Sequence, residues 1–294
     1  MPPPNPTPAD RAGPTTKDSE RGGPAVTGPD GPAPLLGLLP AAGVSLSAFL
    51  LFALMVGWPG HVVLALSLVA AYLIHRPLFR DLLLIGIGIT IVSTTSVEAD
   101  ISWPMFFRLG FVLGAAVLVP VLVDRLVYRR EPAIRFPWFT GRRWTRMQWA
   151  YVVAVPVLGY LILPSYFINS GAYQNWPPIQ TPSEFGRFFV GVNAVGLWDE
   201  LFFICICFAL LRRHFPLWQA NVLQAVIFVS FLWELGYREW GPLLTIPFAL
   251  LQGWIFTRTK SLTYVVIIHL LFDAVVFFAI VHAHDRSIFP FFVY

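Results

Sequence analysis

Ionisable side chains stand inside long apolar stretches in the C-terminal half of this sequence. Asp199 and Glu200 lie in one stretch, Glu234 in the next, and His269 and Asp273 in a third. A charged group at the centre of a bilayer costs about 3 kcal/mol on insertion scales. Five such groups on three helices are therefore expected to face one another, in a polar site within a helical membrane bundle.

Acids and a histidine gathered in such a place can perform proton chemistry. Low dielectric and neighbouring acids favour the protonated form of a carboxylic acid, so one acid can serve as a base near neutral pH while another keeps its proton. The base can activate a water for attack on a peptide carbonyl, and a histidine can stabilise the resulting oxyanion. Two alternatives stay open: the same groups are metal ligands, or they only tie helices together.

Spacing predicts how these side chains meet. His269 and Asp273 are four residues apart and share one helix face. Asp199 and Glu200 are adjacent, about 100° apart around the helix axis, so only one can point at a common centre and the other must face a partner helix. Asp199 and Asp273 each lie about 20 Å from the basic end of their stretch. Glu234 lies nearer the opposite end and needs a bent helix or a water to join them.

Composition places the whole chain in a membrane. Its 294 residues are 56% hydrophobic and 12% charged, and the mean hydropathy is +0.67. A soluble domain carries about 25% charged residues. We therefore expect an integral, multi-pass membrane protein, with the bilayer as its surroundings and no nucleic-acid partner. Cys205 and Cys207 are expected to pack as apolar residues rather than form a redox or metal pair.

Nine apolar stretches follow a tail rich in proline and glycine. Residues 1–34 contain ten of the 26 prolines and no apolar periodicity, which indicates a disordered cytoplasmic tail. The fold class predicted is all-α, a polytopic bundle of about nine spans, with N-terminal transmembrane helices and a basic loop over residues 35–147. The stretches run over about 35–57, 61–75, 81–97, 104–126, 148–168, 185–211, 217–235, 242–257 and 262–283. Gly86, Gly88, Gly110 and Gly114 are expected to allow close helix packing.

Basic residues alternate between the connections. They gather in the connections at 75–80, 127–147, 212–216 and 258–260. They are sparse in the connections at 57–60, 98–103, 169–183 and 236–241, where Arg238 is the exception. Because positive loops stay in the cytoplasm, we expect a cytoplasmic N-terminus and an outer C-terminus, in the inner membrane of the cell.

Three segments, in order, resemble the CAAX protease and bacteriocin-processing (CPBP) superfamily of type II CAAX prenyl endopeptidase-like membrane proteins. That family is marked by Glu-Glu-x-x-x-Arg, then by an aromatic-rich helix that ends in His, then by His-x-x-x-Asn or Asp. The corresponding segments are Asp-Glu-Leu-Phe-Phe-Ile at 199–204, Ser-Phe-Leu-Trp-Glu-Leu at 230–235 and His-Leu-Leu-Phe-Asp at 269–273. Residues 249–260 are similar to the family's penultimate helix, and the resemblance covers roughly residues 185–283.

The resemblance implies an intramembrane endopeptidase domain over residues 148–294 that acts on a peptide or membrane-protein substrate, without a cofactor or metal. Asp199 or Glu200 would be the base and Glu234 its partner in activating water. His269 and Asp273 would be the oxyanion pair.

Three positions depart from the family pattern. The first acid is Asp199, one methylene shorter than Glu; Ile204 replaces the motif Arg; and Glu234 replaces the second-motif His. Asp273 can donate to an oxyanion only when it is protonated. The alternative is therefore a catalytically inactive membrane scaffold or partner-binding protein with the same fold, and a third possibility is an ion or proton pathway through the acids.

Overall fold

The computed structural model describes residues 33–128, 132–141, 143–292 and 294. Apart from its last two residues, the tail predicted over 1–34 lies outside the described residues. Within the described ranges the chain is helical and contains no strand, which confirms the all-α, polytopic fold class.

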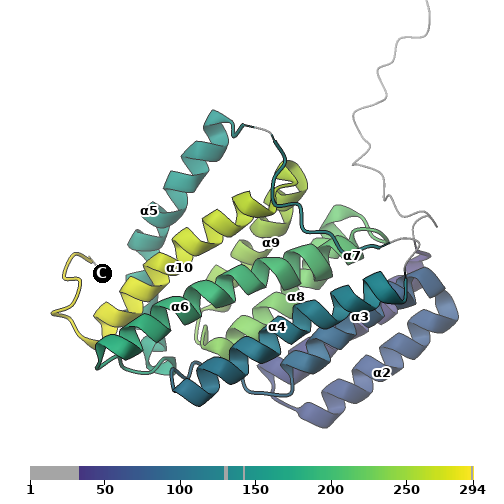
Figure 1. Ribbon diagram of the computed structural model, residues 1–294, viewed down its shortest axis with the longest axis horizontal. Coiled ribbons are helices and arrows are strands. Elements are labelled where there is room, and N and C mark those ends of the chain that lie inside the picture. The colour runs from purple at the N-terminus through teal and green to yellow at the C-terminus, as the bar shows by residue number, and fades with distance from the viewer. Residues whose placement is uncertain (1–32, 129–131, 142, 293) are drawn as a thin grey trace, which may run out of the picture.

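Nine helical stretches make up the described bundle (Figure 1). In chain order they are η2, α1 and η3 (Leu35–Gly37, Leu38–Ala48, Phe49–Ala53), α2 (Gly57–Ile74), α3 (Arg76–Val92), α4 (Trp103–Leu126), α5 (Arg146–Asn169), α6, η5 and α7 (Pro182–Asp199, Glu200–Phe208, Ala209–Leu211), α8 (Leu217–Leu235), α9 (Pro242–Thr259) and α10 (Leu262–His284). A short turn, η4 (Ala172–Asn175), interrupts the connection after α5.

Six of these stretches are long and apolar enough to cross a membrane. They are Leu35–Ala53, Gly57–Ile74, Trp103–Leu126, Arg146–Asn169, Pro182–Leu211 and Leu262–His284. Helix α8 packs against α1, η3, η5 and α9, so its polar side chains are covered by protein rather than lipid. The chain is an integral membrane protein.

The connections gather at two ends of the bundle. At the end that we call the basic end, the connections after α2, α4, α7 and α9 come together. There Asp81 of α3 accepts a hydrogen bond from His214 (2.8 Å) and lies 3.2 Å from Arg213 Nε. Leu262 N donates to Pro137 O over 2.9 Å.

The connections after α3, α5 and α8 meet at the other end, which we call the opposite end. Arg238 Nη2 lies 2.7 Å from Glu98 Oε1, and Asn175 Nδ2 donates to Gly236 O over 2.9 Å. Basic connections alternate with non-basic ones along the sequence, and in the structure the two kinds lie at opposite ends of the bundle.

The start of α6 is fixed by its first residues. Thr181 Oγ1 accepts a hydrogen bond from Glu184 N, and Glu184 Oε2 accepts one from Thr181 N. This reciprocal cap satisfies backbone donors that a helix start leaves free, and Pro182 suits the first helical position. The cap therefore fixes where α6 begins, the helix that ends with Asp199.

A π-helical segment, η5, continues α6 from Glu200 to Phe208. Such wider turns are rare and occur often at functional sites. Trp198 is anchored beside it, because its Nε1 donates to Leu113 O of α4 over 2.7 Å. Cys205 and Cys207 lie within η5, both free and fully buried, as expected for apolar packing residues.

The four glycines expected to pack closely divide into two kinds. A Cβ on Gly88 would lie 2.2 Å from the Phe202 ring, and one on Gly86 would lie 3.2 Å from Leu64. A Cβ on Gly110 or Gly114 would meet nothing within 4 Å. The expectation is therefore wrong for the two glycines of α4, because they border a cavity instead of a neighbouring helix.

Candidate functional site

A cavity of about 350 Å³ extends between α4, α6 and α10. Its walls are mostly apolar, with Leu109 and Leu113 from α4 and Phe248 from α9. Its lining includes residues from the connections at the opposite end: Ala99, Ile101, Trp176 and Tyr237. Asp199, His269 and Asp273 also line it, deep within the bundle.

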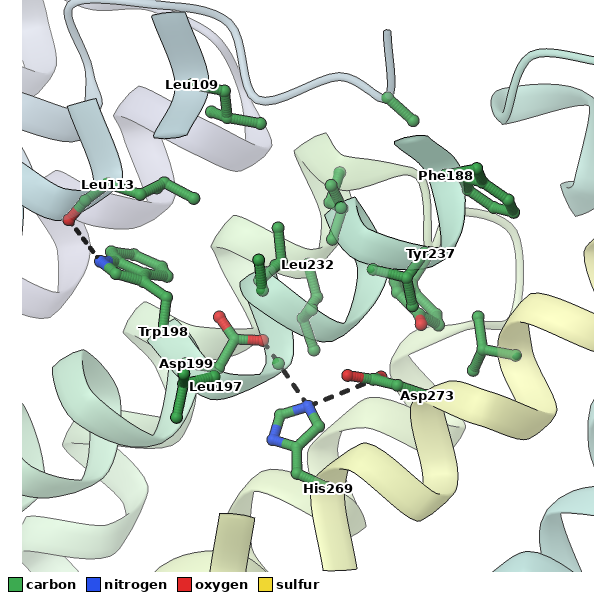
Figure 2. Close-up of a pocket in the computed structure, with 18 of the residues that line it drawn as sticks. Leu109, Leu113, Phe188, Leu197, Trp198, Asp199, Leu232, Tyr237, His269 and Asp273 are labelled. Atoms are coloured by element: carbon green, nitrogen blue, oxygen red, sulfur yellow. Dashed lines mark hydrogen bonds and ion pairs between the residues drawn. The ribbon is translucent and has the colours of Figure 1, made fainter. Parts of the chain in front are cut away.

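His269 is the centre of the polar group. Figure 2 shows Asp199 and Asp273 turned towards the same side of its ring. Its Nε2 lies 3.7 Å from Asp199 Oδ2 and 3.8 Å from Asp273 Oδ1. These are ion-pair distances, too long for direct hydrogen bonds. Three of the five predicted site residues thus share one face of the cavity.

Glu200 contacts the Nδ1 side of the His269 ring, away from Asp199 and Asp273. Its Oε1 lies 2.7 Å from His269 Nδ1 and accepts a hydrogen bond from Gln252 Nε2 over 2.6 Å. The contact to Glu200 favours the imidazole with a proton on Nδ1, which leaves Nε2 facing the aspartates. Glu200 is fully buried and does not line the cavity. The adjacent acids therefore point in two directions, as their spacing predicts.

Two carboxylate oxygens in the cavity wall have no hydrogen-bond partner among the described residues: Asp199 Oδ1 and Asp273 Oδ2. Buried polar atoms are normally paired, so each of these needs an explanation. Both residues border the cavity, but the two oxygens themselves are buried, so a small movement of the side chain brings each of them to a water or a substrate group.

Gly196 makes room for Asp273. A Cβ at this position would lie 1.8 Å from Asp273 Oδ2 and 3.2 Å from His269 Cδ2. Any larger residue would have to displace the carboxylate. The contributions of Gly196 and Gln252 were not predicted. One signal for Gly196 was available, since it precedes Asp199 by three residues and so shares its helix face.

Glu234 lies elsewhere. Its Oε1 accepts a hydrogen bond from Val97 N over 3.1 Å, and it lines a separate cavity with His61 and Thr95. The prediction that all five ionisable residues converge is wrong for Glu234. Helix α8 lines the main cavity with Leu232 and Leu235. Glu234 lies on another face of α8 and contacts the connection after α3.

This arrangement can support hydrolysis with roles divided among the four converging residues. Asp199 Oδ1 can accept a proton from water, and His269 and Asp273 can donate to an oxyanion when they are protonated. Glu200 orients the ring. Among the described residues, no set of three or more His, Cys, Asp or Glu side chains is placed to hold a metal ion.

The comparison with family models agrees with this placement. Residues 181–275 match the model described as type II CAAX prenyl endopeptidase Rce1-like. No curated protein and no solved structure matches the chain. The matched segment starts at the cap of α6 and ends two residues after Asp273, so it includes all four converging residues. The resemblance drawn from the three motif segments is thus confirmed over residues 181–275, which are similar to the Rce1-like type II CAAX prenyl endopeptidases.

Proposed function

We propose that this protein is an intramembrane endopeptidase that hydrolyses a peptide bond with water activated by Asp199. The observation that carries the proposal is the unpartnered Oδ1 of Asp199, in a cavity wall beside an imidazole that Glu200 holds in place. The family match supports the reaction class, peptide hydrolysis within a membrane.

The proposed reaction assigns a proton movement to each step. Water gives a proton to Asp199 as its oxygen attacks the peptide carbonyl. His269 in its doubly protonated form, through Nε2–H, and a protonated Asp273 donate hydrogen bonds to the carbonyl oxygen as it becomes negative. Asp199 then passes its proton to the leaving amine, and the peptide bond breaks to give an acid and an amine. Glu200 and Gln252 position His269 throughout.

We also propose that the N-terminus is cytoplasmic and that the cavity opens away from the cytoplasm. The support is the separation of the two ends, since the basic connections lie opposite the connections that line the cavity. A substrate would then reach the site from the non-cytoplasmic side, as a peptide held at the membrane.

The test is cleavage of a library of fluorescence-quenched peptides by the full chain in proteoliposomes. Asp199→Asn keeps the volume but cannot accept the proton, so we expect a loss of about 10²–10⁴-fold with the protein still folded. Glu98→Gln is the matched control, because Glu98 is an acid at the opposite end that pairs with Arg238. Cleavage at the wild-type rate by Asp199→Asn would reject Asp199 as the base.

One observation favours the second candidate, an inactive scaffold. The family's second motif supplies a histidine, whereas α8 contributes only Leu232 and Leu235 to the cavity lining. A scaffold predicts that Asp199→Asn keeps the cellular effect of the protein at unchanged abundance. A peptidase predicts that the same variant loses the effect.

A further inference from the structure

Arg187 carries the only guanidinium or ammonium group in the described lining of the main cavity. It lies in the second turn of α6, near the connections of the opposite end. Twelve residues separate it from Asp199 on the same helix, which corresponds to about 18 Å. The cavity therefore has Arg187 and the carboxylate of Asp100 towards one end, Asp199 and Asp273 towards the other, and mainly apolar walls between them.

Three contacts hold the Arg187 guanidinium in place. Nε donates to Ile101 O over 2.6 Å, and Nη1 donates to Ser183 Oγ over 2.6 Å. The group also lies over the Trp103 ring, 4.6 Å from its centre. In the described part of the chain, no carboxylate lies within ion-pair distance of Arg187, although Glu184 one turn earlier on α6 interacts with it electrostatically, and Nη2 has no hydrogen-bond acceptor. A charge fixed in position with a spare donor is a preorganised receptor for an anion.

We infer that Arg187 binds a carboxylate of the peptide substrate at the mouth of the cavity, an inference that rests on the proposed function. Arg187 is the one guanidinium or ammonium group in the described lining, so the substrate carboxylate binds there and the neutral amide to be cleaved binds at Asp199 and Asp273. An extended chain covers 18 Å with about five residues. The substrate class is therefore a peptide with a carboxylate about five residues from the scissile bond.

The inference is tested with paired peptides that differ by Glu or Gln at that distance from a cleaved bond. Wild type is expected to favour the Glu peptide by about 10- to 100-fold in kcat/KM. Arg187→Gln should raise KM for the Glu peptide, leave kcat unchanged and remove the preference, while Arg187→Lys should restore part of it. Arg108→Gln is the matched control, because Arg108 is an exposed arginine at the same end that donates to Thr94 O and does not line the main cavity.

A lipid headgroup is the rival occupant, and native mass spectrometry of the detergent-solubilised full chain tests for it. With this occupant, wild type would retain phosphatidylglycerol in preference to phosphatidylcholine, and Arg187→Gln would lose that preference. This result without any Glu preference would overturn the inference and assign the anion site to a headgroup.

Binding without turnover separates this inference from the proposed function. Fluorescence anisotropy of labelled Glu and Gln peptides on Asp199→Asn measures affinity where cleavage is blocked. A Glu preference that depends on Arg187, in a protein that cuts no peptide, would keep the anion site and reject the peptidase. An Arg187→Gln variant with unchanged peptide preference would overturn the inference.

Discussion

Asp199 and Glu200 are neighbours in the chain, yet they face different partners. Asp199 borders the cavity with a free oxygen, whereas Glu200 lies between His269 of α10 and Gln252 of α9. The division separates a group that can reach substrate from one that acts through the imidazole. The Asp199 carboxylate in the cavity wall and the imidazole that Glu200 holds beside it form one unit.

We predict that Glu200→Gln lowers kcat by about 10- to 100-fold with little change in KM, the cost of one hydrogen bond to a charged group. The amide keeps an oxygen that can accept from His269, so the ring is held less firmly but is not lost. Glu200→Asp should recover part of the rate. Steady-state kinetics of Glu200→Gln and Asp199→Asn, measured side by side, test this prediction. An equal loss of kcat in the two variants would contradict it and assign Glu200 the role of the base.

Gly196→Ala is expected to abolish cleavage, because its Cβ would occupy the position of Asp273 Oδ2. The matched control is Gly186→Ala on the same helix, where a Cβ meets nothing within 4 Å and activity should persist. Cleavage rates and melting temperatures in detergent would be compared for both. Full activity of Gly196→Ala would mean that cleavage does not require Asp273 Oδ2 to lie against residue 196.

Glu234→Gln tests whether Glu234 helps to activate water, as the family pattern implies, or lies outside the site, as the structure places it. Its oxygen is committed to Val97 N, and it borders a different cavity from Asp199. We therefore expect the variant to cleave at the wild-type rate, since the amide oxygen can still accept from Val97. A loss as large as that of Asp199→Asn would place Glu234 back in the mechanism.

The residues of the site could be predicted to different extents. His269 and Asp273 follow from a four-residue spacing, and the divergence of Asp199 and Glu200 follows from helical rotation. Glu234 could not be placed, because an apolar stretch without a clear periodic face does not fix which side of α8 turns to the cavity. The role of Gln252 depends on how α9 packs against η5, which is a tertiary contact.

At the scale of elements, close approach depends on single small residues. Gly88 of α3 receives the edge of the Phe202 ring, which lets η5 and the helices behind it pack together. We predict that Gly88→Ala destabilises the protein by about 1–3 kcal/mol through overpacking. Thermal unfolding in detergent checks this, with Gly114→Ala as the control, since a Cβ there meets nothing. Equal stability of the two variants would contradict the packing argument.

The sequence predicted all nine helical stretches, but not all of their limits. The third was expected over 81–97 and runs over Arg76–Val92. Its second turn carries Arg80 and Asp81, which resemble loop residues in a membrane protein. They are helical because partners neutralise them: Arg80 pairs with Asp124, and Asp81 pairs with His214. Such pairs join distant segments and cannot be read from local composition.

Across the whole molecule, the basic connections and the connections that line the cavity lie at opposite ends. The basic connections lie at one end, and the lining of the cavity includes connections of the other, with Asp199 and His269 between them. Of the N-terminal helices, α1 and η3 pack against α8, whereas α4 contributes Leu109 and Leu113 to the cavity. This arrangement makes membrane orientation a mechanistic question, since it decides which compartment supplies the substrate.

We predict that the end lined by the connections after α3 and α5 faces away from the cytoplasm, because basic connections stay inside. Gln174→Cys in η4 is exposed at that end, and Thr140→Cys is exposed near the basic end. Both native cysteines are buried, so they should give little background. A membrane-impermeant maleimide should label Gln174→Cys in intact cells and Thr140→Cys only after permeabilisation. The reverse pattern would invert the orientation and open the cavity to the cytoplasm, while the geometry around Asp199 would stand unchanged.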